Sequence, residues 1–395
     1  MIKEYEIIVL CVFFVVWLIS MIHSRRILWL RKQAEKAVSK EPIPAQQLPG
    51  LSVILTTYNQ EELLRKHLPL MLEQEYPAEF EVIVVDMNSS DETLQYLEQT
   101  EKRYHNLHYT SVPNSSRNVS VMRLAITLGM KAAANDWTIL TNASCAPKSH
   151  HWLKQMGQAC VEKEETNIVI GYTSIKRNRF KNARKARFFH FWQQIRNLRY
   201  ATRHGAYRAE ANNLGYRRSF FLQNKGFMEG NRLQAGATEI LVNHNSTRAN
   251  TTICVHPEAV VEVDLPHNEG WWRQERLFFM ETRSHFRHKN PYRMQYLGSS
   301  LLIWLLTLTT FTAIATFALS LPDWYAVGII AAITVFWQIN SFHRIVCYNK
   351  VCKTMGEHTF SPLLPYFLHT IIWWDIAAWI QWRMTPKRTF HIKPL

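Results

Sequence analysis

The sequence predicts an α/β fold in which a mostly parallel β-sheet is flanked by helices, with membrane helices at both ends of the chain. Three observations predict it. Short, apolar, β-branched runs alternate with helical patterns between residues 45 and 292, and this order is typical of a parallel sheet. Uncharged apolar runs lie before and after this stretch. We therefore expect an N-terminal transmembrane anchor with a basic linker (1–44), a cytoplasmic α/β domain (45–292) and a C-terminal membrane region (293–395).

Composition excludes several classes of protein. The 395 residues are 47% hydrophobic and 19% charged, which is unlike a disordered chain or a charged coiled coil. The mean hydropathy of −0.19 excludes a protein that lies mostly in the bilayer. Six scattered cysteines do not predict a disulfide scaffold. The net charge of +15 leaves nucleic acid, anionic lipid and phosphorylated substrates open as partners.

The first apolar run, residues 6–22, has the length of a short membrane helix and carries no charge after Glu6. Basic residues follow the run rather than precede it, so we expect a retained anchor and not a cleaved signal peptide. The positive-inside rule then places the C-terminal side of the anchor in the cytoplasm.

The C-terminal region contains two uncharged runs, residues 297–321 and 324–339, which predict a transmembrane hairpin with a very short turn. A further segment, 363–382, is rich in tryptophan but also contains Pro365, His369 and Asp375. Basic residues flank it on both sides, so we expect an interfacial or re-entrant helix.

In the middle of the chain, the expected elements follow one another as strand and helix. The expected strands are Leu51–Thr57, Phe80–Asp86, Leu107–Ser111, Trp137–Thr141 and Ile168–Gly171. Helices are expected after residue 60, after Ser90 or Asp91 as a cap, and over Val119–Ala134. Ligands of such sheets bind beyond the carboxyl ends of the strands, here residues 56–59, 86–88 and 142–145. The glycine-rich phosphate loops of the common nucleotide fingerprints are missing from the sequence.

Five blocks of the sequence resemble glycosyltransferase family 2, in the order in which the family has them. They are SVILTTYN (52–59), EVIVVDMNSSDETLQYLE (81–98), RLAITLGMKAAANDWTILTNASCAP (123–147), NNLGYRRSFF (212–221) and GATEILVNHNS (236–246). The resemblance, to membrane-anchored bacterial members, covers roughly residues 50–290. It implies a GT-A fold with a nucleotide-sugar half followed by an acceptor half.

The resemblance also implies roles for individual residues. Thr57 and Tyr58 would line the base pocket, and Asp86 would hydrogen-bond the nucleobase or ribose, unless Asp86 only caps a turn. Asn213 and Arg217 would shape the pyrophosphate or acceptor pocket, together with Tyr216. The segment 271–276 resembles the family's Trp-x-x-Gln-x-x-Arg segment, with its arginine displaced by one position. The residues of this segment that we place at the phosphate or acceptor are Trp271, Arg273, Gln274 and Arg276.

The chain departs from the family at the metal motif. Family members have an Asp-x-Asp pair that holds Mg²⁺ or Mn²⁺ against the diphosphate. The matching positions here are Asn142 and Ser144, which are neutral. We place both residues in the nucleotide-sugar site, name no metal ligand, and expect divalent-cation binding to be weak, absent or made mainly through the diphosphate.

A second departure affects the general base. The family's usual aspartate position falls on Ala237, and Glu239 is the one acid left in the block 236–246. An inverting transferase needs a carboxylate that accepts the proton of the acceptor hydroxyl. Glu239 is therefore our candidate base; the alternatives are an acid at a helix start or a structural ion pair.

Thirteen basic residues and one acid, Glu210, lie between Lys176 and Arg218, with aromatic residues interleaved. This stretch fits anionic lipid headgroups, a phosphate of the donor or of a lipid-linked acceptor, or a solvated helix face. Nucleic acid is disfavoured by the neighbouring membrane anchor.

The leading hypothesis is a membrane-associated inverting glycosyltransferase of the hexosyltransferase type at the bacterial inner membrane. It would move a sugar from a nucleotide-sugar to a lipid-linked or polysaccharide acceptor at the cytoplasmic face. The alternative is an inactive relative that serves as scaffold or binding partner in a polysaccharide or glycolipid assembly complex. A processive synthase with its own export channel is disfavoured because the membrane helices are too few.

Overall fold

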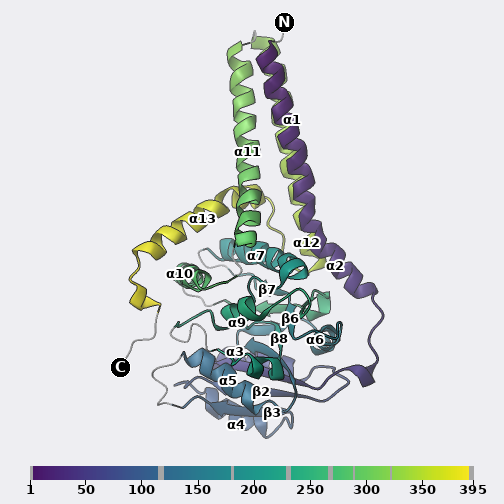
Figure 1. The fold of residues 1–395 in the computed structure, drawn as a ribbon, viewed down its shortest axis with the longest axis vertical. Helices are drawn as coiled ribbons and strands as arrows, with labels where there is room; N and C mark the ends of the chain where they lie inside the picture. Colours follow the sequence, from purple (N-terminus) through teal and green to yellow (C-terminus); the bar gives the residue numbers. More distant parts are fainter. Residues whose placement is uncertain are drawn as a thin grey trace. The chain divides into compact units, whose positions relative to one another are not determined.

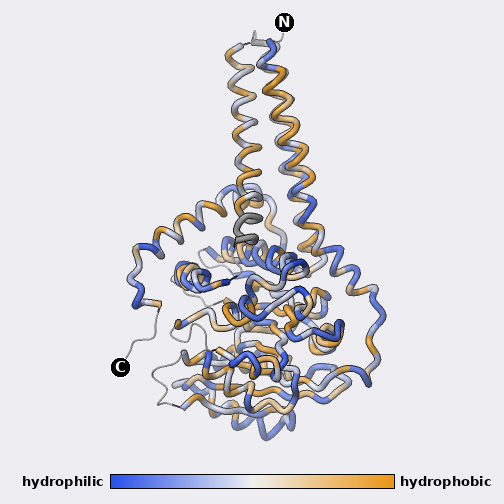
Figure 2. The backbone as a smooth tube through the Cα atoms, in the orientation of Figure 1, coloured by the Kyte–Doolittle hydropathy of each residue, from blue (hydrophilic) through white to orange (hydrophobic). Residues whose placement is uncertain are grey.

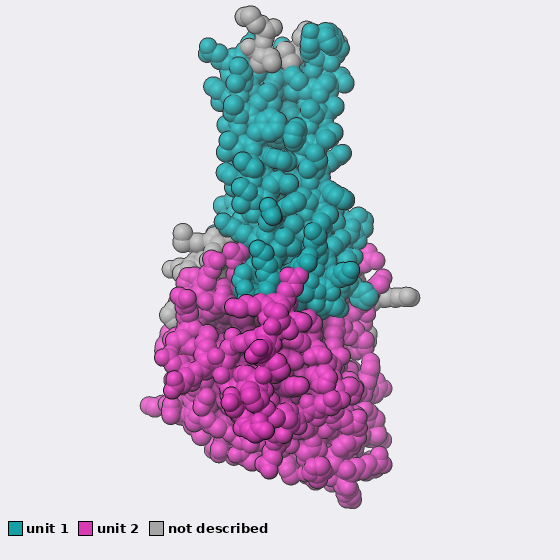
Figure 3. Space-filling model, turned by 90° about the vertical axis from the view of Figure 1, so that its right-hand side faces the viewer, with its two compact units in different colours: residues 1–33, 290–376 teal, residues 34–289, 377–395 magenta. Residues whose placement is uncertain are grey.

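The computed structural model describes residues 3–113, 120–178, 182–227, 233–265, 270–287, 290–320 and 323–390, with the backbone alone for 290–296 and 323. The chain forms two compact units (Figure 3). One unit contains residues 1–33 and 290–376, and the other contains residues 34–289 and 377–395. The predicted division at residues 44 and 292 stays a prediction.

The larger unit is built on a seven-stranded sheet with the order β3-β2-β1-β4-β8-β6-β9. Its strands are β1 (Leu51–Thr57), β2 (Phe80–Asp86), β3 (Leu107–Ser111), β4 (Trp137–Asn142), β6 (Ile168–Gly171), β8 (Leu214–Arg217) and β9 (Thr251–Cys254). Every residue of β1 is buried, because this strand lies between two parallel neighbours and beneath helices on both faces. The mostly parallel sheet confirms the predicted fold class.

A second, three-stranded sheet has the order β5-β10-β7, with β5 (Cys145–Pro147), β7 (Thr173–Ile175) and β10 (Val261–Val263). The helices of this unit are α3 (Glu61–Leu72), α4 (Thr93–Glu101), α5 (Val121–Ala132), α6 (Trp152–Cys160), α7 (Ala183–His204), α8 (Arg218–Gln223), α9 (Ala237–Asn245) and α10 (Trp271–Ser284) (Figure 1). The start of the predicted helix Val119–Ala134 lies partly outside the described residues, and the described helix is α5.

Strand β8 was not predicted, and it changes the meaning of several residues. It runs antiparallel to both β4 and β6, so its carboxyl end lies beside the amino end of β4. Trp137, the first residue of β4, pairs with Arg217, the last residue of β8. Residues at the end of β8 therefore lie at the sheet edge opposite Asn142.

Helix α7 shows that the basic stretch is not a solvated helix face. Most of its side chains are buried, among them Phe188, Phe191 and Arg187. The interleaved aromatic residues pack into the domain, and the fold distributes the basic residues of this stretch to different places. That interpretation of the stretch as a solvated face was wrong.

The smaller unit contains α1 (Glu4–Ser24), α11 (Asn290–Ser320), α12 (Asp323–Thr354) and the larger part of α13 (Leu364–Met384), with α2 (Leu28–Ser39) following α1. Three described helical segments are long and apolar enough to cross a membrane: Glu4–Ser39, Leu297–Ser320 and Trp324–Thr354. Figure 2 shows the hydrophobic colouring along α1 and α11. Helix α12 does not end with the apolar run at residue 339, because its helical hydrogen bonding continues through the polar residues to Thr354.

Helices α1 and α12 are joined by polar contacts as well as apolar ones. The indole of Trp17 donates to the Phe336 carbonyl at 2.7 Å, and the Ser20 hydroxyl donates to Asn340 Oδ1 at 3.2 Å. The buried guanidinium of Arg344 donates to the same Asn340 oxygen at 2.9 Å. The first two bonds join α1 to α12, and the third, within α12, orients the Asn340 side chain. The predicted turn between the two C-terminal runs begins at residues 321–322, outside the described residues, and the interfacial position of 363–382 stays a prediction.

Candidate active site

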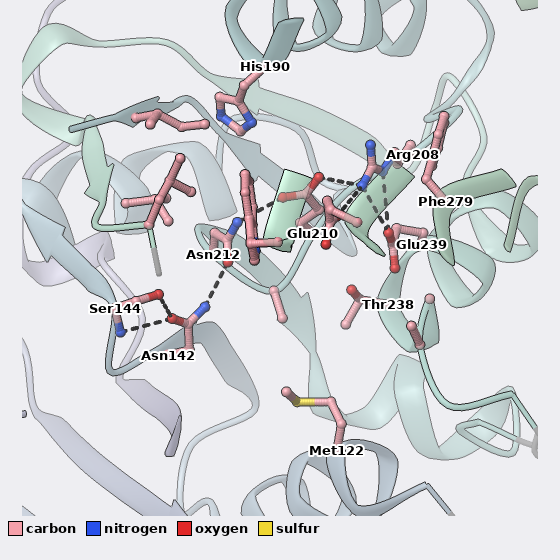
Figure 4. Close-up of a pocket in the computed structure, with 18 of the residues that line it drawn as sticks. Met122, Asn142, Ser144, His190, Arg208, Glu210, Asn212, Thr238, Glu239 and Phe279 are labelled. Atoms are coloured by element: carbon pink, nitrogen blue, oxygen red, sulfur yellow. Dashed lines mark hydrogen bonds and ion pairs between the residues drawn. The ribbon is translucent and has the colours of Figure 1, made fainter. Parts of the chain in front are cut away.

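A cavity of about 390 Å³ lies at the carboxyl end of β4 (Figure 4). Its polar lining comes from the turn after β4, from α7, from the segment before β8 and from the starts of α9 and α10. The polar and aromatic side chains that line it include Thr56, Asn142, Ser144, His190, Gln193, Arg208, Glu210, Asn212, Thr238, Glu239, Asp264, Trp271, Trp272, Glu275, Arg276 and Phe279. The cavity therefore lies where a parallel sheet is expected to bind its ligand.

A chain of amide hydrogen bonds crosses one end of the cavity. Asn142 Oδ1 accepts from the backbone N–H of Ser144 at 3.0 Å and also from the Ser144 hydroxyl. Asn142 Nδ2 donates to Asn212 Oδ1 at 2.7 Å, and Asn212 Nδ2 donates to Glu210 Oε2 at 2.8 Å (Figure 4). Both polar atoms of the Asn142 side chain are thus engaged with protein groups.

These residues do not fit a divalent cation of the kind that the family's Asp-x-Asp motif holds. The Asn142 oxygen that would face the cation already accepts two hydrogen bonds from Ser144. Neither residue supplies the negative charge that Mg²⁺ and Mn²⁺ prefer in their ligands. Within the described ranges, no group of three His, Cys, Asp or Glu side chains could hold a metal ion.

Arg208 is the centre of an ionic cluster that continues this chain of hydrogen bonds through Glu210. Its Nη2 lies 2.6 Å from Glu210 Oε1, 3.2 Å from Glu239 Oε1 and 3.7 Å from Glu275 Oε1. Its Nη1 donates to Gln193 Oε1 at 3.0 Å. The Arg208 side chain is 6% exposed, so three carboxylates share one buried guanidinium; Figure 4 labels two of them, Glu210 and Glu239.

Aromatic packing holds two arginines of this site in place. The guanidinium of Arg208 lies 4.2 Å from the ring centroid of Phe279. The guanidinium of Arg276 lies 3.9 Å from the ring of Phe189 and 5.6 Å from that of Trp272. Cation–π contacts of this kind are strengthened where the cation is desolvated. They orient both cations within the wall of the cavity.

The three carboxylates of the cluster differ in acidity because their surroundings differ. Burial favours the neutral form of Glu210, but the Arg208 guanidinium outweighs it and holds the pKa of Glu210 below its ordinary value. Burial raises the pKa of Glu239 in spite of Arg208. Desolvation of the Glu275 carboxylate, together with repulsion from Glu210, raises the pKa of Glu275 to about 7, although the side chain is 47% exposed.

Glu239 is positioned by the start of α9. The residue before this helix, Gly236, has φ +79°, and a Cβ there would lie 2.3 Å from Thr282 side-chain atoms. Glycine therefore allows the chain to enter α9 in a left-handed conformation against α10. Glu239 occupies the first turn of the helix, where the helix dipole favours a negative charge.

The structure brings together some of the predicted site residues. Asn142, Ser144, Glu239, Trp271 and Arg276 all line the cavity. Trp271 and Arg276 come from the start of α10.

Other predicted residues of α10 and β1 face elsewhere. Arg273 and Gln274 are exposed, because Trp272, Glu275 and Phe279 occupy the face of α10 that lines the cavity. Thr56 rather than Thr57 lines the cavity, since side chains alternate along a strand.

The nucleotide-site predictions at the ends of β1 and β2 are not joined to this cavity. Tyr58 is 53% exposed, and Thr57 is buried. Asp86 is buried and accepts a hydrogen bond from the Ser89 backbone N–H at 3.0 Å, a bond that caps the turn; its contact with a nucleotide stays a prediction. Asp91 likewise accepts from the backbone N–H groups that begin α3 and α4, at 3.2 Å each.

The structure corrects the predicted positions of Asn213 and Arg217. Asn213 is 2% exposed, and its amide accepts from Trp152 Nε1 at 3.0 Å and donates to two buried carbonyl groups. Arg217 lies at the opposite edge of the sheet, over the ring of Trp137, because β8 runs antiparallel. Neither residue lines the 390 Å³ cavity.

Sequence reasoning missed Arg208, Glu210, Asn212 and Glu275 as site residues. A signal for the first three does exist: polar residues alternate at 208, 210 and 212 immediately before β8, and alternate residues of an extended chain share one side. Glu275 could not be found in this way, because its approach to Arg208 depends on how α10 packs.

The architecture and the site together define the class of protein. The sheet with its cavity at the carboxyl end of β4 has the arrangement of a GT-A glycosyltransferase. Residues 52–224 match the family model for glycosyl transferase family 2, and this part of the chain is a domain of that family.

This chain spans less than a third of the length of the two curated relatives described next. A dolichyl N-acetyl-α-D-glucosaminyl phosphate 3-β-D-2,3-diacetamido-2,3-dideoxy-β-D-glucuronosyltransferase of Methanococcus voltae is 29% identical over 99 residues, 25% of this chain and 30% of that protein. A hyaluronan synthase of Pasteurella multocida is 25% identical over 147 residues, 37% of this chain and 14% of that protein. The mannosyltransferase PcManGT from Pyrobaculum calidifontis, solved with GDP-Man and Mn²⁺, shares the fold, with a TM-score of 0.51 at 17% identity over 94% of this chain and 97% of its own.

Proposed function

We propose that this protein is a membrane-associated, inverting hexosyltransferase that moves a sugar from a nucleotide-sugar to a lipid-linked or polysaccharide acceptor. The observation that carries the proposal is that one cavity contains both the turn after β4 and the start of α9. These segments correspond to the donor and base motifs of the family, and they supply Asn142, Ser144 and Glu239 to the same space.

In this proposal Glu239 accepts the proton of the acceptor hydroxyl as that oxygen attacks the anomeric carbon. The nucleoside diphosphate leaves from the opposite face of the sugar, and the anomeric configuration inverts. A general base works best with a pKa near the operating pH, and burial shifts the pKa of Glu239 in that direction. Arg208 holds the carboxylate in place through its 3.2 Å contact.

Two aromatic side chains provide an apolar wall for the sugar. Trp271 and Trp272 line the cavity at the start of α10, with ring centroids 6.4 Å apart. Aromatic rings present flat apolar surface, which matches the C–H face of a pyranose. Trp271 is therefore placed as a stacking residue for the donor sugar or the acceptor.

Membrane attachment follows from the three apolar helices, and we place the catalytic domain on the cytoplasmic side of a bacterial inner membrane by the positive-inside rule. Anionic lipids and a protein partner in an assembly complex remain proposed partners. The names of the two curated relatives, a dolichyl-linked saccharide transferase and a hyaluronan synthase, support a lipid-linked or polymeric acceptor.

The test is donor turnover by the full chain in detergent. UDP-, GDP- and dTDP-sugars are supplied with a polyprenyl-phosphate-linked acceptor, and release of nucleoside diphosphate is measured. Glu239→Gln is expected to lower kcat about 10²- to 10⁴-fold, the usual contribution of a general base. Glu98→Gln, at an exposed site on α4, is the matched control. Full activity in Glu239→Gln rejects Glu239 as the base, and no turnover of any donor rejects the enzyme in favour of a binding role.

A further inference from the structure

Three chain segments converge beside the turn that carries Asn142 and Ser144. The backbone N–H of Asp264, just after β10, donates to the Ser144 carbonyl at 2.8 Å. The backbone N–H of Lys176, just after β7, donates to the Val263 carbonyl at 3.0 Å. Because β7 and β10 are parallel and β5 is antiparallel to β10, the ends of β7 and β10 meet the start of β5 at one edge.

Helix α3 adds a fourth segment to this edge. The ring of His67 lies 2.9 Å, through Nδ1, from the carbonyl oxygen of Ala143, in the same turn after β4. The preceding residue, Lys66, is exposed, and its ammonium group lies near enough to that of Lys176 for the two charges to interact. This interaction lowers the pKa of Lys66.

The ammonium group of Lys176 forms an ion pair with Asp264, next to the turn that carries Asn142. Lys176 Nζ lies 2.5 Å from Asp264 Oδ2, and Asp264 lines the cavity. Lys148 pairs with Glu262 on the same small sheet at 3.2 Å. At the edge itself, Lys66 and Lys176 therefore share the single carboxylate of Asp264.

We propose that the ammonium groups of Lys66 and Lys176 take the place of the divalent cation and bind the diphosphate of the donor. This inference rests on the proposed function, because it assigns a charge-compensating group to that same site. Lys66 and Lys176 share the one carboxylate of Asp264. An anion with several oxygens, bound between the two ammonium groups, would supply the missing negative charge and hydrogen-bond acceptors. The leaving diphosphate would then be stabilised by fixed protein charges and not by a metal ion.

The neutral turn fits this assignment. If Asn142 and Ser144 were carboxylates, they would repel a diphosphate that no metal ion shields. The Asn142 amide instead keeps the turn closed through its bonds to Ser144 and adds no charge. Asp264, which lines the cavity, orients Lys176 through their ion pair.

The experiment measures binding of inorganic pyrophosphate to the full chain in detergent, by calorimetry, in EDTA and again with Mn²⁺. We expect binding in EDTA, no more than a small gain from Mn²⁺, and weakening by raised salt. Lys66→Ala and Lys176→Ala should each weaken binding about 10- to 100-fold, the usual effect of removing a hydrogen bond to a charged group. Lys176→Arg should retain most of it, and Lys131→Ala, at an exposed site on α5, is the control.

The outcomes separate this inference from the proposed function. Pyrophosphate binding that requires Mn²⁺, no binding under either condition, or unchanged binding in Lys66→Ala overturns the inference. Because Lys66 is exposed, its substitution tests the idea even if Lys176→Ala fails to fold. Donor turnover with Mn²⁺-dependent binding leaves the proposed function standing without the inference. Metal-free binding that depends on the two lysines, without turnover of any donor, supports the inference and removes the proposed function.

Discussion

Replacing Arg208 by methionine tests the ionic cluster of the cavity most directly. Methionine keeps much of the packing volume against Phe279 but removes the guanidinium that Glu210, Glu239 and Glu275 share. Deleting one partner of a buried ion pair costs about 3–5 kcal/mol, because the remaining charge stays buried without compensation. We count the full effect for Glu210 and Glu239, and discount Glu275 because its side chain is 47% exposed.

The expected loss depends on pH in a definite direction. Glu239 and Glu275 already have raised pKa values in the folded protein, so their contribution to stability is present at low pH and is lost as pH rises through those values. Without Arg208 the pKa values of Glu239 and Glu275 rise further, and the pKa of Glu210 rises as well. The variant should therefore differ most from the native chain above about pH 7 and least near about pH 4.5.

Thermal unfolding of the full chain in detergent, near pH 5 and near pH 8, measures this difference. A loss of about 3–5 kcal/mol corresponds to a fall in Tm of about 6–20 °C for a domain of this size. Arg65→Met is the matched control, because Arg65 forms an exposed pair with Glu61 on α3 and such pairs contribute about 0.5 kcal/mol. If Arg208→Met unfolds within the control's range at the higher pH, the cluster does not carry the charge balance described above.

Two further substitutions test the acidity of Glu275 and the packing beneath the cavity. Glu275→Gln should flatten the fall in Tm between about pH 4.5 and about pH 7, since the raised pKa of Glu275 makes its ionisation destabilising over that range; an unchanged slope would contradict this. Gly171→Ala should cost about 1–3 kcal/mol, because the new Cβ would lie 2.2 Å from the Asn213 amide, which its buried hydrogen bonds hold in place. Gly328→Ala, where nothing lies within 4 Å, is the control, and equal Tm values for the two alanine variants would contradict the packing argument.

Local pattern was sufficient for the parallel part of the sheet. Strands β1, β2, β3 and β6 have the predicted bounds, and β1, β2 and β6 are short runs rich in apolar and β-branched residues. Strand β8 was missed because its four residues, Leu-Gly-Tyr-Arg, show neither alternation nor an apolar run. It is a strand because Gly215 allows a close approach to Val169, where a Cβ would lie 2.9 Å from the valine side chain.

The candidate site divides in the same way between local and tertiary features. Asn142 and Glu239, two of the predicted site residues, both line the cavity, and their roles there stay predictions; a strand end and a helix start can be located from sequence. Arg208, Glu275 and Asp264 come from three separate segments, and their meeting depends on the antiparallel insertion of β8 and on the packing of α10. A single sequence contains no signal for such contacts.

The distribution of charge in the cavity constrains how a nucleotide-sugar could bind. Acidic groups gather at Arg208, at the starts of α9 and α10, whereas the turn after β4 is neutral and lies beside Lys176. A diphosphate placed among the carboxylates would be repelled at short range in a poorly screened space. A nucleotide-sugar bound the other way round, with its phosphates near Lys176 and its sugar near Glu239, would avoid this repulsion. In that orientation the departing anion and the proton-accepting carboxylate would lie on opposite sides of the anomeric carbon, which is the arrangement that an inverting displacement requires.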